Sequence, residues 1–155
     1  MSEFSFKIIV DNGGGDPAEM AMQGLAAIEA AIAINIMYFN RHPEDICALA
    51  CGMVKYDSAK KTLLDLVGDI ETAPILIKKG YGLCIAIVAF DVAAKRFEGY
   101  NAWPVVIDQE GGYFHVITEM ELPDGSVVQL DPSSELERIG IIIEGRSPQC
   151  FTCRI

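Results

Sequence analysis

The chain has 155 residues, of which 51% are hydrophobic and 22% are charged, and its formal net charge is −10. This composition is typical of a globular protein and excludes a disordered chain, and the length suits one domain over residues 1–155. The negative charge disfavours nucleic acid and an acidic membrane surface as partners, because both present negative phosphate.

The first half of the chain, residues 1–79, is predicted to be mainly helical. A short strand over 4–10 precedes a glycine-rich turn, and Asp16-Pro17 is then a typical helix start with Asp16 as the cap. We predict three helices, over residues 17–40, 43–54 and 58–67. Pro74 and the sequence Lys78-Lys79-Gly80 indicate a loop after them.

The second half, residues 80–155, is predicted to hold a core helix and then a sheet. The helix runs from Ile85 to about Arg96, and it is expected to be buried because only Asp91 interrupts its apolar run before Lys95. Alternating apolar residues then predict strands over 103–107, 113–121, 127–130 and 139–143. Helices followed by an antiparallel sheet indicate an α+β fold, with the helical N-terminal part packed on the sheet.

No membrane or export signal is expected. The N-terminus lacks the basic start and apolar stretch of a signal peptide. The most apolar stretch, residues 24–39, is interrupted by Glu29 and Asn35 and is short for a bilayer span of ~20 residues, so a buried core helix is predicted. Five cysteines, an odd number, fit a reducing cytoplasm better than a disulfide framework, so we expect a cytoplasmic protein.

The residues able to carry chemistry are few. There are two histidines: His42 is expected in a solvated loop, and His115 lies in a predicted strand. Cys84 lies where a glycine-bearing loop enters the buried helix, and backbone N–H groups at a helix N-terminus lower a thiol pKa. Two antiparallel strands joined by Pro123-Asp124-Gly125 would bring His115 close to Asp131, so a Cys–His–Asp triad is predicted.

The strings GYGLC, HVITE and LPDGSVVQLDPS resemble motifs of the transglutaminase-like superfamily of papain-type thiol enzymes. The matching region covers about residues 80–134. The resemblance implies a papain-like core with the nucleophile at the N-terminus of a central helix. It implies that Cys84 is the nucleophile, that His115 is general base and then acid, and that Asp131 orients the imidazole. Glu119 matches a family position, but no role is assigned to it.

The sequence departs from the family at two places. Ile117 stands where an aromatic residue often follows the histidine, and no Gln or Trp lies close upstream of Cys84 to serve as an oxyanion-hole side chain. The backbone N–H of Cys84 is one candidate donor.

The expected function is that of a thiol-dependent hydrolase or acyl transferase acting on amide bonds of a peptide or protein, without cofactor or metal. Hydrolysis and transamidation both stay open, because they differ only in the second acceptor. The alternative is an inactive binding or assembly protein of the same fold, joined to a partner or to a second copy through apolar surface. Less favoured are a zinc site or a redox role for the remaining thiols, which are Cys47, Cys51, Cys150 and Cys153.

Overall fold

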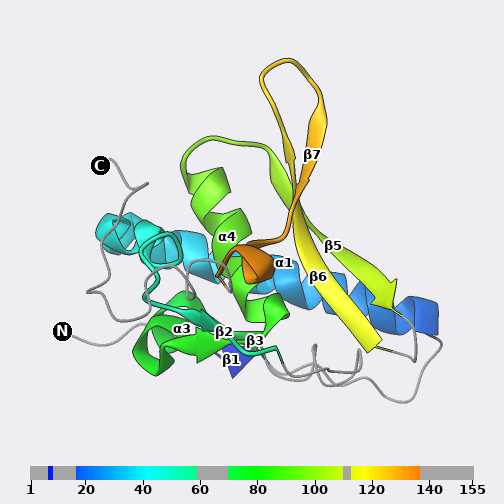
Figure 1. Cartoon of the computed structure of the whole chain (residues 1–155), viewed down its shortest axis with the longest axis horizontal. Coiled ribbons are helices and arrows are strands. Elements are labelled where there is room, and N and C mark those ends of the chain that lie inside the picture. Colours follow the sequence, from blue (N-terminus) through cyan, green and yellow to red (C-terminus); the bar gives the residue numbers. More distant parts are fainter. Residues whose placement is uncertain (1–6, 9–16, 59–69, 110–112, 137–155) are drawn as a thin grey trace.

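The computed structural model describes residues 7–8, 17–58, 70–109 and 113–136 (Figure 1). Over these residues the architecture is α+β, as the sequence predicts. The elements in chain order are β1 (Lys7–Ile8), α1 (Pro17–Arg41), η1 (Pro43–Cys47), β2 (Lys55–Tyr56), β3 (Ile70–Glu71), α3 (Ala73–Lys79), β4 (Tyr81–Gly82), α4 (Cys84–Phe97), β5 (Ala102–Gln109), β6 (Tyr113–Glu121) and β7 (Val127–Leu130).

Helix α4 is the central element of the core. All of its side chains from Cys84 to Phe90 are buried, which matches the apolar run in the sequence. It contacts α1 as well as strands β5 and β6, so it lies between the long N-terminal helix and the sheet (Figure 1). Phe90 packs edge-to-face on Phe39 of α1, with 5.0 Å between the ring centroids.

Helix α1 ends one residue beyond the predicted helix and is buried on one face only. Ile28, Ile32 and Phe39 have no exposed surface, whereas Met22 and Met37 are exposed. Residues 22–41 are long and apolar enough to cross a membrane, but 44% of that window is buried inside the protein. Core helices meet the same criteria of length and composition, and the buried face of α1 contacts α4 as a core helix does.

Strands β5, β6 and β7 form a three-stranded antiparallel sheet in that order (Figure 1). The sequence predicted β6 and β7 with their observed bounds, and β5 is longer than predicted at both ends. Strand β7 pairs with β6 only from Thr118 to Glu121, so the first half of β6 extends beyond β7. The predicted strand over 139–143 lies outside the described residues.

A buried polar contact fixes α4 against this sheet. The Thr118 hydroxyl of β6 donates a hydrogen bond of 2.8 Å to Asp91 of α4, and the same carboxylate forms an ion pair of 2.5 Å with Lys95. Asp91, the single charge that interrupts the apolar helix, is therefore the residue that joins the helix to the central strand.

The predicted helix over 43–54 is wrong. Only the 3-10 helix η1 forms, and turns follow it as far as Gly52, whose φ of 70° lies in the left-handed region. Pro43 begins the helix, but a left-handed glycine ends helical geometry, and β2 begins at Lys55. Of the predicted helix over 58–67, only Ser58 is among the described residues.

The predicted loop at Pro74 is also wrong, because helix α3 begins at Ala73. Its N-terminus is capped from another element: the backbone N–H of Ala73 donates a hydrogen bond of 2.7 Å to the buried side-chain oxygen of Asn35 in α1. Pro74 is tolerated in the first helical turn, and Gly80, with φ of 80°, ends the helix. The predicted loop residues thus mark the two ends of a helix.

Two pairs of two-residue strands complete the N-terminal part. Strand β1 pairs antiparallel with β3, and β2 pairs parallel with β4. The strand predicted over 4–10 is described only at Lys7–Ile8, and the predicted cap Asp16 lies outside the described residues. The pairing of β2 with β4 was not predicted, and it holds the segment that leads into Cys84.

Candidate active site

Strand β4 and the residue after it deliver Cys84 to the start of α4. The parallel pairing sets Tyr56 beside Gly82, and Leu83 is extended before the helix begins. A Cβ atom on Gly82 would lie 2.3 Å from the buried Leu76 side chain, so any larger residue here would force Leu76 of α3 to move. The glycine of the G-x-C motif therefore has a steric role.

Cys84 is the first residue of α4, and its exposed fraction is 4%. The backbone N–H groups in the first turn of a helix have no acceptor within the helix, and here the bond from Ile87 to the Leu83 carbonyl is the first to close. These N–H groups can stabilise an oxyanion that develops close to them.

His115 and Asp131 come together as the sequence predicts. His115 lies in the part of β6 beyond its pairing with β7, and Asp131 is the residue that directly follows β7. The His115 Nε2 atom lies 2.8 Å from Asp131 Oδ2.

Cys84 lies beside His115 and acts on its pKa, so the structure brings all three predicted residues together. The Cys84 side chain is the largest influence that raises the pKa of His115, and burial of the ring opposes it. The hydrogen bond and the negative charge of Asp131 add to the effect of Cys84, and the pKa of His115 rises to about 9 from an ordinary 6.5. The imidazole therefore holds its proton at neutral pH.

Asp131 has a second role in the fold. Burial raises its pKa, but hydrogen bonds to His115 and Ser134 outweigh burial, so the pKa of Asp131 is lowered. The Ser134 hydroxyl lies 3.0 Å from Oδ2, and the Ser134 backbone N–H lies 3.3 Å from Oδ1. Asp131 thus caps the helical turn at 132–136 while it holds His115.

Glu119, to which the sequence assigned no role, accepts two hydrogen bonds across the sheet. The Trp103 indole N–H of β5 donates one at 2.7 Å, and the Gln129 amide of β7 donates the other at 3.0 Å. The three residues face one another in register across all three strands. Only the spacing of four residues between His115 and Glu119, which places both on one face of β6, signals this arrangement in the sequence.

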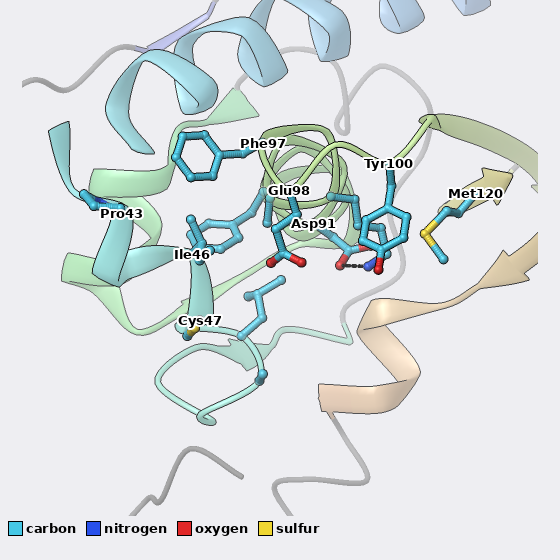
Figure 2. A pocket seen from close by; sticks show the side chains of 13 residues that line it. Pro43, Ile46, Cys47, Asp91, Phe97, Glu98, Tyr100 and Met120 are labelled. Carbon is cyan, nitrogen blue, oxygen red and sulfur yellow. Dashed lines mark hydrogen bonds and ion pairs between the residues drawn. The ribbon is translucent and has the colours of Figure 1, made fainter. Parts of the chain in front are cut away.

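A pocket of about 770 Å³ lies elsewhere, between η1, the C-terminal half of α4 and β6 (Figure 2). Cys84, His115 and Asp131 do not line it. Apolar walls dominate, and Asp91 and Glu98 add carboxylates. The labelled side chains in its walls are Pro43, Ile46, Cys47, Asp91, Phe97, Glu98, Tyr100 and Met120.

The structure also bears on the other residues that could bind a metal or act as redox groups. Cys47 and Cys51 are both disulfide-bonded, which removes them as zinc ligands and differs from the expectation of reduced cysteines. Cys150 and Cys153 lie outside the described residues. Within those residues, His42, Glu44 and Asp45 have ligand atoms within 4.8 Å of one another.

In the cluster of His42, Glu44 and Asp45, two side chains contact Tyr38 of α1. Asp45 accepts a hydrogen bond of 2.5 Å from the Tyr38 hydroxyl. The predicted loop histidine His42 is half-buried, and its ring stacks 4.7 Å from that of Tyr38.

Comparison of the chain with protein-family models, with curated proteins and with solved structures finds no match.

Proposed function

We propose that the protein is a thiol-dependent hydrolase or acyl transferase that acts on amide bonds of a peptide or protein. One observation carries the proposal: His115 lies beside Cys84, which raises its pKa, and it is hydrogen-bonded to the Asp131 carboxylate at 2.8 Å. A nucleophile, a base and a group that orients the base are the parts that covalent catalysis at a carbonyl needs. The position of Cys84 at the start of a buried central helix supports a papain-like core with transglutaminase-like motifs.

In the first half of the reaction, His115 is protonated beside the Cys84 sulfur, which attacks the amide carbonyl carbon as a thiolate. The carbonyl oxygen becomes an oxyanion, and the N–H groups at the start of α4 stabilise it. When the tetrahedral intermediate collapses, the C–N bond breaks and His115 gives its proton to the leaving amine. A thioester on Cys84 and a free amine result.

In the second half, His115 removes a proton from the attacking acceptor. Water as acceptor gives a carboxylic acid, and a primary amine gives a new amide. The C–S bond breaks, and Cys84 leaves as a thiolate beside the protonated His115. Asp131 keeps the imidazole in one orientation through both halves, because its carboxylate is fixed to Nε2 and to Ser134.

The test has two stages. Native protein is first treated with iodoacetamide over a range of pH, and each cysteine is followed by peptide mass spectrometry. We expect Cys84 to react at neutral pH and His115→Ala to slow it by at least about tenfold, because the imidazole no longer favours the thiolate. An unchanged rate in His115→Ala would contradict the proposal.

The second stage looks for the thioester. A library of peptide amides is added, and the reaction is quenched with acid. We expect an acyl mass on Cys84, released amine in the solution, and loss of both in Cys84→Ser. Added glycine ethyl ester then distinguishes the acceptors, since a new amide indicates transamidation and a free acid indicates hydrolysis.

A binding or assembly protein of the same fold is the second candidate. Two observations favour it: Cys84 is only 4% exposed, and the pocket of about 770 Å³ lies away from the three residues. This candidate predicts that Cys84 is not acylated by any library member. It also predicts that Cys84→Ser and the native chain behave alike in every binding measurement.

A further inference from the structure

The sheet contains one residue that links all three of its strands through side-chain hydrogen bonds. Glu119 in the middle strand accepts N–H groups from Trp103 on one side and Gln129 on the other, at 2.7 and 3.0 Å. Its two carboxylate oxygens each take one donor, and the backbone register places the three residues directly opposite one another.

The Glu119 hydrogen bonds lie close to the end of β7, where the alignment of β7 with β6 sets the distance between Asp131 and His115. The ladder between β6 and β7 spans only the pairs from Glu121↔Val127 to Thr118↔Leu130. Asp131 follows immediately after the last pair, so its place relative to His115 depends on the alignment of this short ladder.

The side chains of β7 bury little surface, so their packing contributes little to holding the strand in place. Its side chains alternate between exposed and half-buried, and Val127 has an exposed fraction of 52%. A short, exposed strand with few buried contacts opens more readily than a core strand. The Gln129–Glu119 bond adds a side-chain tie between the strands, two residues before Asp131.

We propose that Glu119 is a positioning residue for the His115–Asp131 pair, because it fixes the register of β7 against β6 through Gln129. This role rests on the proposed thiol chemistry of Cys84. Glu119 acts through Asp131 and needs no contact with substrate.

The experiment compares iodoacetamide alkylation of Cys84 against pH in native protein, Glu119→Ala, Asp131→Asn and the double variant. If Glu119 acts through Asp131, Glu119→Ala slows alkylation by about fivefold, and it adds nothing in the Asp131→Asn background. Glu119→Gln should restore the rate to within about twofold, since a glutamine can accept from Trp103 and donate to a rotated Gln129 amide.

Three controls separate positioning from general stability. Glu121→Ala removes a hydrogen bond of 2.9 Å to Asn101 on the same face of β6, but that bond does not reach β7, so the rate should stay unchanged. Gln129→Met should reproduce Glu119→Ala, whereas Trp103→Phe, which keeps the β6–β7 link, should not. If Glu119→Ala fails to fold, Gln129→Met and Trp103→Phe still test whether the Glu119–Gln129 bond affects the alkylation rate.

The outcomes are distinct. Equal slowing by Glu119→Ala with and without Asp131→Asn overturns the positioning role, as does equal slowing by Glu119→Ala and Glu121→Ala. An Asp131→Asn protein that matches native protein at every pH overturns the role of Asp131 in the proposed function itself. Slowing by Asp131→Asn without slowing by Glu119→Ala leaves the proposed function standing and removes Glu119 from it.

Discussion

Asp131 joins the chemistry of the site to the local fold. Its carboxylate contacts His115 at 2.8 Å and accepts hydrogen bonds from Ser134, so it serves two purposes at once. An asparagine at this position still offers an oxygen to the Ser134 N–H. The amide lacks the negative charge that favours a protonated imidazole, so a single substitution separates the two purposes.

We therefore predict that Asp131→Asn slows Cys84 alkylation at neutral pH by about tenfold, because the pKa of His115 falls when the carboxylate charge is removed. The melting temperature should change little, since the cap is kept. Alkylation rates and thermal melts of the two proteins test this. A large loss of stability with an unchanged alkylation rate would identify Asp131 as a cap alone.

The raised pKa of His115 also predicts how stability depends on pH. The folded protein holds this proton up to about pH 9, whereas the unfolded chain releases it near 6.5, its ordinary value. The stabilisation is therefore complete below pH 6.5, and it is lost as the pH rises to about 9.

The loss should reach up to about 3 kcal/mol. Urea denaturation of native protein and His115→Gln at several pH values measures it. The difference between the two proteins should shrink from pH 6.5 to 9, and a difference that is constant or grows would contradict the shifted pKa.

At the scale of elements, α3 depends on a cap that another helix supplies. The N-cap residue Thr72 makes no side-chain capping bond, and Asn35 from the middle of α1 takes the first N–H group instead. Asn35 has no exposed surface, so water cannot replace this bond when the side chain is removed.

We predict that Asn35→Ala lowers the free energy of unfolding by about 2 kcal/mol. The matched control is Asn40→Ala on the same helix, where the amide bonds to the Ile36 carbonyl at an exposed position, and the cost should stay below about 0.5 kcal/mol. Chemical denaturation of both variants measures the difference. Equal costs would show that the cap contributes little.

At the scale of the whole molecule, the three cysteines among the described residues divide into two kinds. Cys84 is free, whereas Cys47 and Cys51 are disulfide-bonded. The odd total of five led the sequence analysis to a reducing compartment, but an odd number is compatible with disulfides when one thiol is kept free. Disulfides are typical of oxidising surroundings, and the cytoplasmic location expected from the sequence stays a prediction.

Without a reductant, iodoacetamide should therefore modify Cys84 and leave Cys47 and Cys51 unmodified. Added reductant should expose both to labelling and lower the free energy of unfolding by about 2–4 kcal/mol. Peptide mass spectrometry and denaturation curves with and without reductant provide the measurement. Labelling of Cys47 and Cys51 in untreated protein would contradict the disulfides.

Much of the C-terminal half could be predicted because its signals are local. The apolar run of α4 and the period of two in β6 and β7 reflect burial patterns that each segment carries itself. The meeting of His115 and Asp131 followed from strand adjacency across one turn, and Cys84 was expected beside them at the N-terminus of a helix packed on the sheet. These are contacts between elements that lie close together along the chain.

The N-terminal half was harder because its structure depends on distant contacts. The helix at Ala73 needs an acceptor from Asn35, and the pairing of β2 with β4 joins segments with little strand pattern of their own. The link through Glu119 was missed for a related reason, since its two partners come from two other strands. Local propensity carries no information about such partners.

The burial of Cys84 has a consequence for how the protein can evolve. A free cysteine in a core acts as a small apolar side chain, so alanine or serine at residue 84 would leave the neighbouring core nearly unchanged. One substitution can thus end the proposed chemistry while the fold, its pocket and its surfaces persist. A lineage carrying this fold can lose a catalyst and keep a binding protein in a single mutational step.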